Sequence, residues 1–160
     1  FKVLTNRNKI FFLKSLRSIF KSKNTYNFDN ITNTIITQFD KSIDYTGNCE
    51  IDKKMNWKNI ISLNSENIFT IAPHSHNHKI LSFCDDKTLK TEILKSIYLL
   101  KQKAKITNNH YSYPDGQKNH YNKKVIKILK ASGVRCCPSA ITGVNNLKTN
   151  LFDLKRIMVV

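Results

Sequence analysis

From Asn56 onward, the sequence alternates amphipathic helical patterns with short apolar runs of strand length. This alternation is typical of a parallel sheet whose strands are joined by crossover helices. It restricts the possible folds more than any other feature of the chain, and it predicts the α/β class. The predicted strands are Ile68 to Ala72, Tyr111 to Tyr113, Val134 to Cys137 and Leu154 to Val160.

The helices between these strands show capping residues at their ends and apolar stripes along one face. Asn56 and Asp85 are favourable N-caps, because a short polar side chain can accept from the unpaired backbone N–H groups of the first turn. Gly133 ends the third helix, since glycine adopts the left-handed conformation at little cost. The three stripes are Trp57, Ile60 and Ile61; Leu89, Ile93, Ile97 and Leu100; and Val125, Ile126, Leu129 and Ala131.

Residues 1–50 differ in character and are predicted to form a helical insertion or linker segment. Two helical patterns occur there, and polar residues separate them. Neither pattern carries a set of residues that indicates chemistry. Their apolar positions are Phe12, Leu13, Leu16, Ile19 and Phe20, and then Ile31, Ile35 and Phe39.

The chain has a formal net charge of +16 at pH 7. A strongly positive charge is typical of proteins that bind nucleic acid or anionic surfaces. The lysines are scattered along the chain, however, and they accompany a general enrichment in Lys, Asn and Ile that is typical of biased codon usage. We therefore expect no specific nucleic-acid partner. No apolar run is long enough to cross a bilayer, so no transmembrane segment is expected, and nothing in the sequence indicates the oligomeric state.

The four cysteines lack the paired C-x-x-C spacing of a zinc site or a redox motif. They are Cys49, Cys84, Cys136 and Cys137. Unpaired thiols are typical of a reducing compartment, which favours the cytoplasm.

Two polar clusters follow the first two predicted strands. His74-Ser75-His76-Asn77-His78 comes after one strand, and Tyr113-Pro114-Asp115-Gly116 comes after the next. Ligand sites of α/β sheets lie beyond the carboxyl ends of the strands, so we expect the two clusters to lie close together. His74 and His78 are four positions apart and can direct ring nitrogens at one metal ion, whereas His76 would point elsewhere.

Taken alone, the H-x-x-x-H spacing leaves two interpretations open. A surface or structural pair of histidines is the more common case, and a metal site is the alternative that the position after an apolar strand favours. The zinc-protease interpretation is excluded, because Ser75 stands where that motif needs a glutamate and Pro73 precedes the first histidine.

The order of these features resembles the polysaccharide deacetylases, a family of the carbohydrate esterase type with a NodB-like homology domain. The matching pieces are Met55-Asn56-Trp57, His74-Ser75-His76-Asn77-His78, Tyr111-Ser112-Tyr113-Pro114-Asp115-Gly116 and Leu154-Lys155-Arg156-Ile157. The resemblance covers residues 51–160 and implies the central part of a partial, distorted (β/α) barrel, preceded by the helical segment. It also implies a bacterial origin and an acetylated carbohydrate as the substrate.

By resemblance, the protein is a metal-dependent hydrolase that removes N- or O-linked acetyl groups from a carbohydrate by attack of a metal-activated water. The family holds one divalent ion, usually zinc, between an aspartate and two histidines, which implies His74 and His78 as ligands here. Ser75 would brace the loop by hydrogen bonds. The turn from Tyr113 to Gly116 would line the substrate groove, and the backbone N–H of Asp115 would donate to the developing oxyanion.

Two parts of the family pattern are missing. The aspartate-rich motif that supplies the third metal ligand and the general base is not found, and Phe39-Asp40 is a poor candidate because it lies in a helical pattern. We expect that motif before Phe1 and the histidine motif with the general acid beyond Val160, so that the chain is an internal fragment and inactive alone. His110 and His120 are expected to be solvent-exposed and do not replace the acid.

The alternative is a non-catalytic module of the same fold that binds a carbohydrate or an anionic polymer. The missing motifs favour it, and so does Asp115, which replaces a usual aromatic residue and puts negative charge near the oxyanion position. A salt-sensitive affinity that chelators leave unchanged would distinguish this module from the enzyme.

Overall fold

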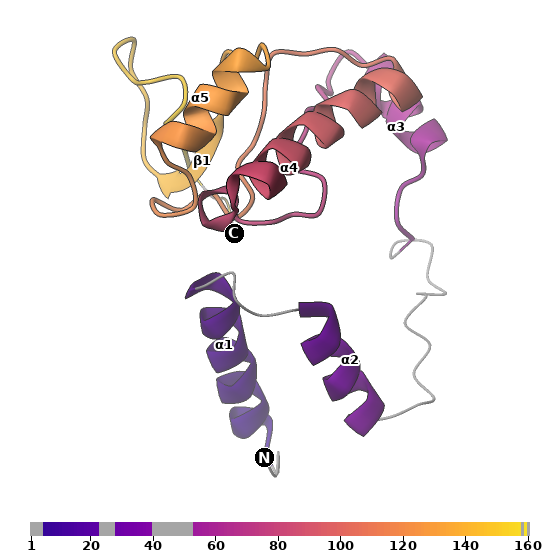
Figure 1. The fold of residues 1–160 in the computed structure, drawn as a ribbon, viewed down its shortest axis with the longest axis vertical. Helices are drawn as coiled ribbons and strands as arrows, with labels where there is room; N and C mark the ends of the chain where they lie inside the picture. Colours follow the sequence, from indigo (N-terminus) through magenta and orange to yellow (C-terminus); the bar gives the residue numbers. More distant parts are fainter. Residues whose placement is uncertain (1–4, 23–27, 40–52, 158, 160) are drawn as a thin grey trace. The chain divides into compact units, whose positions relative to one another are not determined.

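The computed structural model describes residues 5–22, 28–39, 53–157 and 159 (Figure 1). The chain divides into two compact units, Phe1–Lys53 and Lys54–Val160. The first unit contains helices α1, Asn6–Ser22, and α2, Phe28–Phe39, at the positions of the two predicted helical patterns. Asp40 and the predicted boundary near residue 50 lie outside the described residues, so the division into residues 1–50 and 51–160 stays a prediction.

The second unit is built from helices, turns and two short strands. Its elements in chain order are α3, Trp57–Ser65; η2, Leu81–Phe83; α4, Asp86–Leu99; η3, Leu100–Ala104; α5, Lys123–Ala131; β1, Pro138–Thr142; and β2, Leu154–Arg156. The short η2 is a 3₁₀ turn, and η3 is a π-helical turn that continues α4. None of the helices in the described ranges is long and apolar enough to span a membrane.

Both predicted N-caps are confirmed. The Asn56 side chain accepts from the backbone N–H of Asn59 at 3.0 Å, and the Asn56 N–H donates back to the Asn59 side chain. Asp85 accepts from the backbone N–H of Thr88 at 2.8 Å, and this bond lowers the pKa of its carboxyl group. These bonds satisfy N–H groups that have no partner within the helix, and they therefore set where α3 and α4 begin.

The core of the second unit includes the facing sides of α4 and α5 (Figure 1). Leu89 and Ile93 of α4 are buried, as their stripe predicts, and Val125 and Leu129 are buried on α5. The other core residues are Leu81, Cys84, Tyr111, Tyr113, Val134, Cys137 and Phe152. Helix α3 has no buried residue, so its apolar face does not contribute to this core.

Two short strands form a ladder within the described residues, and they run parallel. Pro138 lies opposite Leu154, and Thr142 lies opposite Arg156. Strand β2 falls within the predicted strand from Leu154 to Val160, whereas β1 begins directly after the predicted strand from Val134 to Cys137. The prediction for Val134 to Cys137 is therefore wrong in its bounds, although it locates the right part of the chain.

The predicted strands from Ile68 to Ala72 and from Tyr111 to Tyr113 are wrong, because neither forms a ladder. Single backbone bonds join them to their neighbours: Ser112 N–H donates to the carbonyl of Pro73, and Tyr111 N–H donates to the carbonyl of Cys136, both at 3.1 Å. Ile68 is 85% exposed, so no neighbouring strand covers the start of the first segment. An apolar run forms a strand only where such a neighbour packs against it, and the run itself does not supply one.

These single bonds still place the segments side by side in chain order. Pro73 lies beside Ser112, His110 and Cys136 form a parallel bridge, and β1 lies beside β2. The loops that follow the segments therefore meet at one edge of the second unit. The described part of the chain contains a two-stranded sheet and no closed barrel.

Candidate functional site

The segment from His74 to His78, called the histidine loop from here on, brings two imidazoles together. Ser75 and His78 have φ angles of 66° and 55°, in the left-handed region that residues other than glycine rarely adopt. The rings of His74 and His78 lie side by side, with centroids 4.8 Å apart and an interplanar angle of 73°. The two residues that the sequence singles out are thus neighbours in space, and their role as metal ligands stays a prediction.

The ring of His74 is oriented by a hydrogen bond to the neighbouring segment. Its Nδ1 lies 2.8 Å from the carbonyl oxygen of Ser112. A carbonyl can only accept, so Nδ1 carries the proton, and in the neutral ring Nε2 keeps its lone pair. The N–H of Ser112 in turn donates to the carbonyl of Pro73, so two bonds hold the start of the loop against this segment.

Electrostatics favours the neutral form of His74. Partial burial lowers its pKa below the usual value, and electrostatic interactions with His78 and Arg156 lower it further. The bond to Ser112 and the carboxylate of Asp115 act in the opposite direction without reversing the shift. Arg156, at the end of β2, and Asp115, in the predicted turn, therefore both interact electrostatically with His74.

Glu92 also belongs to this site, and the sequence patterns missed it. The side chain projects from α4 and is only 2% exposed. Its carboxylate accepts from the backbone N–H groups of His76 and Asn77 at 3.0 and 2.7 Å, and from the Asn77 side-chain amide at 2.8 Å. A detectable signal existed: Glu92 lies three positions after Leu89 and next to Ile93, so it is a charged residue on an otherwise buried helix face.

The ring of Tyr113 is part of the core. It is 1% exposed and stacks on Tyr121 with centroids 4.1 Å apart and planes 2° apart. Its hydroxyl donates to the carbonyl of Phe152 at 3.0 Å, and burial raises the pKa of this hydroxyl, which keeps it a donor. Tyr113 therefore supports the turn from inside the protein.

The turn bends at Asp115 and Gly116, whose φ angles are 55° and 60°. The N–H of Gly116 donates to the carbonyl of Pro114 at 2.6 Å, and the Gly116 carbonyl accepts from the N–H of Ala140 at 2.8 Å. The second bond joins the turn to β1. Of the four turn residues, only Asp115 is not buried, so Asp115 is the one accessible from outside.

The predictions for Ser75, His110 and His120 have different results: one stays untested, one is confirmed and one is wrong. The hydroxyl of Ser75 is buried and has no hydrogen-bond partner among the described residues, so its predicted bracing of the loop stays a prediction. His110 is exposed, as predicted. The expectation that His120 is solvent-exposed is wrong, because this residue is 6% exposed, accepts from the N–H of Gln117 at 3.3 Å and packs edge-on against Phe83.

The described residues around the two histidines do not complete a metal site. Within residues 5–22, 28–39, 53–157 and 159, no three or more His, Cys, Asp or Glu side chains are grouped so that they could hold a metal ion. Catalytic zinc sites use three protein ligands and leave one position for water. Imidazole nitrogens are zinc ligands by their chemistry, but two of them alone are fewer than such a site needs.

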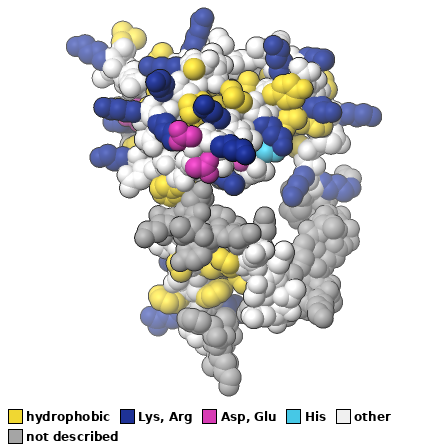
Figure 2. Space-filling view, in the orientation of Figure 1, with side chains coloured by type: hydrophobic (Ala, Val, Ile, Leu, Met, Phe, Trp, Pro, Cys, Tyr) yellow, Lys and Arg dark blue, Asp and Glu magenta, His cyan; other side chains and the backbone are white. Residues whose placement is uncertain are grey.

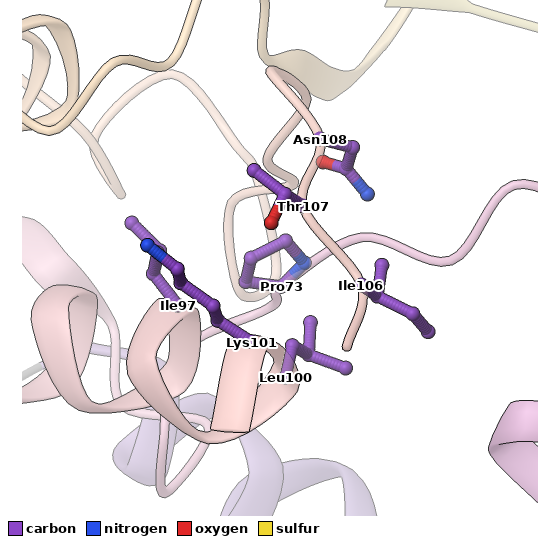
Figure 3. A pocket seen from close by; sticks show the side chains of 7 residues that line it. All are labelled: Pro73, Ile97, Leu100, Lys101, Ile106, Thr107 and Asn108. Atoms are coloured by element: carbon purple, nitrogen blue, oxygen red, sulfur yellow. The ribbon is translucent and has the colours of Figure 1, made fainter. Parts of the chain in front are cut away.

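A small pocket adjoins Pro73 at the start of the histidine loop (Figure 3). Its lining comes mostly from the end of α4, from η3 and from the segment that follows, and comprises Pro73, Ile97, Leu100, Lys101, Ile106, Thr107 and Asn108. Lys101 is the one charged residue of this lining, and no carboxylate or imidazole belongs to it. The pocket therefore offers no group for hydrolysis.

The fold has counterparts among solved deacetylases. The Streptococcus pyogenes deacetylase PplD in complex with acetate has a TM-score of 0.62 and 18% identity, covering 68% of this chain and 46% of that one. The BpsB deacetylase domain from Bordetella bronchiseptica has a TM-score of 0.57 and 16% identity, covering 64% of this chain and 48% of that one. The chain thus spans about half the length of these structures. At these identities, the likeness concerns the fold alone.

These likenesses define the class of the fold as that of the deacetylases. The family described as Polysaccharide deacetylase matches residues 27–137, which is more than half of the 160 residues. The chain therefore belongs to the polysaccharide deacetylase family, as the order of its motifs predicts. The match includes residues 27–50, which the sequence patterns assign to an insertion or linker. A search of curated proteins finds no match.

Proposed function

We propose that this protein is a divalent-metal-dependent hydrolase that removes N- or O-linked acetyl groups from a carbohydrate, and that the histidine loop belongs to its active site. The observation that carries the proposal is the hydrogen bond from His74 Nδ1 to the carbonyl of Ser112. Histidines that bind metals commonly donate their second ring nitrogen to such an acceptor, which orients the other nitrogen toward the ion. Membership of the family supports the same reaction, and so does the likeness to a deacetylase solved with acetate, the acid that deacetylation releases.

In this proposal His74 and His78 hold the ion through ring nitrogens, and zinc is a metal that suits such ligands. A bound divalent ion supplies a water of lowered pKa and polarises the acetyl carbonyl. The contribution of the chain is to keep His74 oriented and neutral, so that its lone pair is available near neutral pH. We propose that an aspartate ligand, the general base and the general acid come from residues outside the described part.

The turn from Tyr113 to Gly116 is proposed to border the substrate. Asp115 is accessible and interacts electrostatically with His74, and both observations support this role. The bond between Gly116 and Ala140 holds the turn beside β1. The backbone N–H of Asp115 is then the candidate donor to the oxyanion, because a fixed N–H stabilises the charge that develops on the acetyl oxygen.

The second unit is proposed to be part of a distorted (β/α) barrel. The side-by-side order of the segments at Pro73, Ser112 and Cys136, followed by β1 and β2, supports this architecture. In a barrel, parallel neighbours follow one another in chain order, with helices between them. The strands that would complete it are proposed to lie outside the described residues.

Zinc binding by the full chain tests the proposal. We expect His74→Ala and His78→Ala each to weaken zinc affinity by about tenfold or more, whereas His110→Ala, a change at an exposed histidine, leaves it unchanged. Acetate release from an N-acetylated and an O-acetylated oligosaccharide then tests the reaction in the same variants. Zinc affinity and acetate release that stay unchanged in both histidine variants would refute the proposal.

A non-catalytic binding module is the second candidate, and the charge of the protein favours it. The net charge is +16, and Figure 2 shows Lys and Arg side chains spread over the visible face rather than gathered in one stripe. Such a distribution attracts anionic polymers with little selectivity. This function predicts an affinity for heparin that falls steeply with salt and is the same with EDTA and in His74→Ala.

A further inference from the structure

The strongest unassigned feature is the buried carboxylate of Glu92. Charged side chains are rarely buried unless their polar atoms find partners, because burial removes them from water. Among the described residues, the hydrogen-bond donors to this carboxylate belong to the histidine loop: the backbone N–H of His76, and both the backbone N–H and the side-chain amide of Asn77. The carboxylate therefore joins α4 to the middle of this loop.

We propose that Glu92 is a positioning residue, whose carboxylate holds the middle of the histidine loop and thereby sets the spacing of His74 and His78. This inference rests on the proposed function of the two histidines as metal ligands. Glu92 itself does not touch the ion or the substrate in this proposal. It acts through the backbone between the two ligands.

The loop needs such an anchor because its backbone is strained. Ser75 and His78 both adopt left-handed φ angles, which persist only where the surroundings stabilise them. The bond from His74 to Ser112 holds the start of the loop. The bonds to Glu92 hold its middle, between the two rings whose centroids are 4.8 Å apart.

The two carboxylate oxygens accept different hydrogen bonds, so substitutions can separate the bonds to the backbone from the bond to the Asn77 side chain. Oε2 accepts both backbone N–H groups, and Oε1 accepts only the amide of Asn77. In Glu92→Gln, the remaining oxygen can accept both backbone bonds while the Asn77 amide turns its own oxygen toward the new NH₂ group. In Glu92→Met, a side chain of similar length packs in the same space and accepts neither bond.

The experiment compares zinc affinity and amide hydrogen exchange in the full chain and in four variants. We expect Glu92→Met to raise the zinc Kd by about tenfold or more and to speed exchange at His76 and Asn77. Glu92→Gln should stay within about threefold of the wild type, because a neutral amide oxygen keeps the backbone bonds. Asn77→Ala should also stay close to the wild type, since it keeps both backbone bonds. Glu66→Gln is the matched control, because Glu66 is exposed.

The outcomes separate this inference from the proposed function. A folded Glu92→Met variant with wild-type zinc affinity and wild-type exchange would overturn the inference, and so would a loss in Glu92→Gln as large as that in Glu92→Met. If Glu92→Met does not fold, the Glu92→Gln and Glu92→Ala variants provide the same comparison. A wild-type chain that binds no zinc would contradict the proposed function, while exchange at His76 and Asn77 would still report whether Glu92 holds the loop.

Discussion

Nδ1 of His74 lies 2.8 Å from the carbonyl oxygen of Ser112, which is 38 residues further along the chain. The bond joins the two polar clusters that the sequence predicts to meet: the histidine loop, and the segment that enters the Pro-Asp-Gly turn. It also determines which nitrogen of the ring carries the proton. The spacing of the two histidines is weak evidence alone, and this bond gives the ring of His74 a defined orientation.

Gly116→Ala should disrupt the turn beside the histidine pair. A Cβ at this position would lie 2.7 Å from the backbone nitrogen of Ala140, and the φ angle of +60° is unfavourable for alanine. We expect a loss of about 1–2 kcal/mol from the left-handed backbone and a further 1–3 kcal/mol from the clash. Urea unfolding measures the difference.

Gly133→Ala is the matched control for this change. Gly133 has a φ of +86°, but nothing lies within 4 Å of an added Cβ, so only the backbone term applies. The prediction is contradicted if the two variants lose equal stability.

Tyr121→Phe should loosen the support of the turn without removing the stacked ring. The hydroxyl of Tyr121 donates to Asp153, while its ring stacks on Tyr113. We expect the free energy of unfolding to fall by about 1 kcal/mol, because one hydrogen bond is lost and the stacking is kept. Tyr98→Phe, at a tyrosine that is 60% exposed, serves as the control. Equal stability of the two variants would show that the Asp153 bond contributes nothing.

The stability of the protein should fall in alkaline solution. Cys137 is fully buried, and burial raises the pKa of its thiol from 9.0 to about 12. The folded state therefore disfavours the thiolate, so the contribution of Cys137 is complete below about pH 9 and is lost as the pH rises toward 12. Cys137→Ala should show a shallower decline of the urea midpoint over this range than the wild type. Parallel declines would mean that ionisation of this thiol is not linked to unfolding.

Zinc should raise the melting temperature of the wild-type chain, and EDTA should reverse the effect. A ligand that binds only the folded state stabilises it by about 2.7 kcal/mol at a hundredfold excess over its Kd. His74→Ala and His78→Ala should lose this shift, whereas His110→Ala should keep it, because His110 is exposed. A shift that survives in both ligand variants would locate zinc elsewhere on the protein.

Patterns of neighbouring residues predicted a large share of the structure. The caps at Asn56 and Asp85 and the buried positions Leu89 and Ile93 are confirmed, because each depends on residues within one or two helical turns. The absence of a strand from Ile68 to Ala72 was not predictable in this way. An apolar run has the composition of a strand, but pairing depends on a neighbour that the run does not specify.

The residues of the candidate site also fall into two groups: those that the sequence singles out and those that only the structure identifies. His74, His78 and the turn from Tyr113 to Gly116 stand out in the sequence because their residue types and spacings are unusual. Glu92 is marked only by its place beside the apolar stripe of α4, and one glutamate in a helix is ordinary until its burial is known. The same holds for His120, whose burial contradicts the expectation of an exposed side chain.

The sequence by itself determined the family, the positions of the helix caps and the candidate ligands, because these follow from residue types at short or ordered spacings. Only the tertiary structure decided that Ser112 orients His74 and that Glu92 holds the loop between the two histidines. Those contacts join residues 15 to 38 positions apart. They depend on how α4 and the neighbouring segments pack against the loop, and a hydrogen bond forms only where packing brings donor and acceptor within reach.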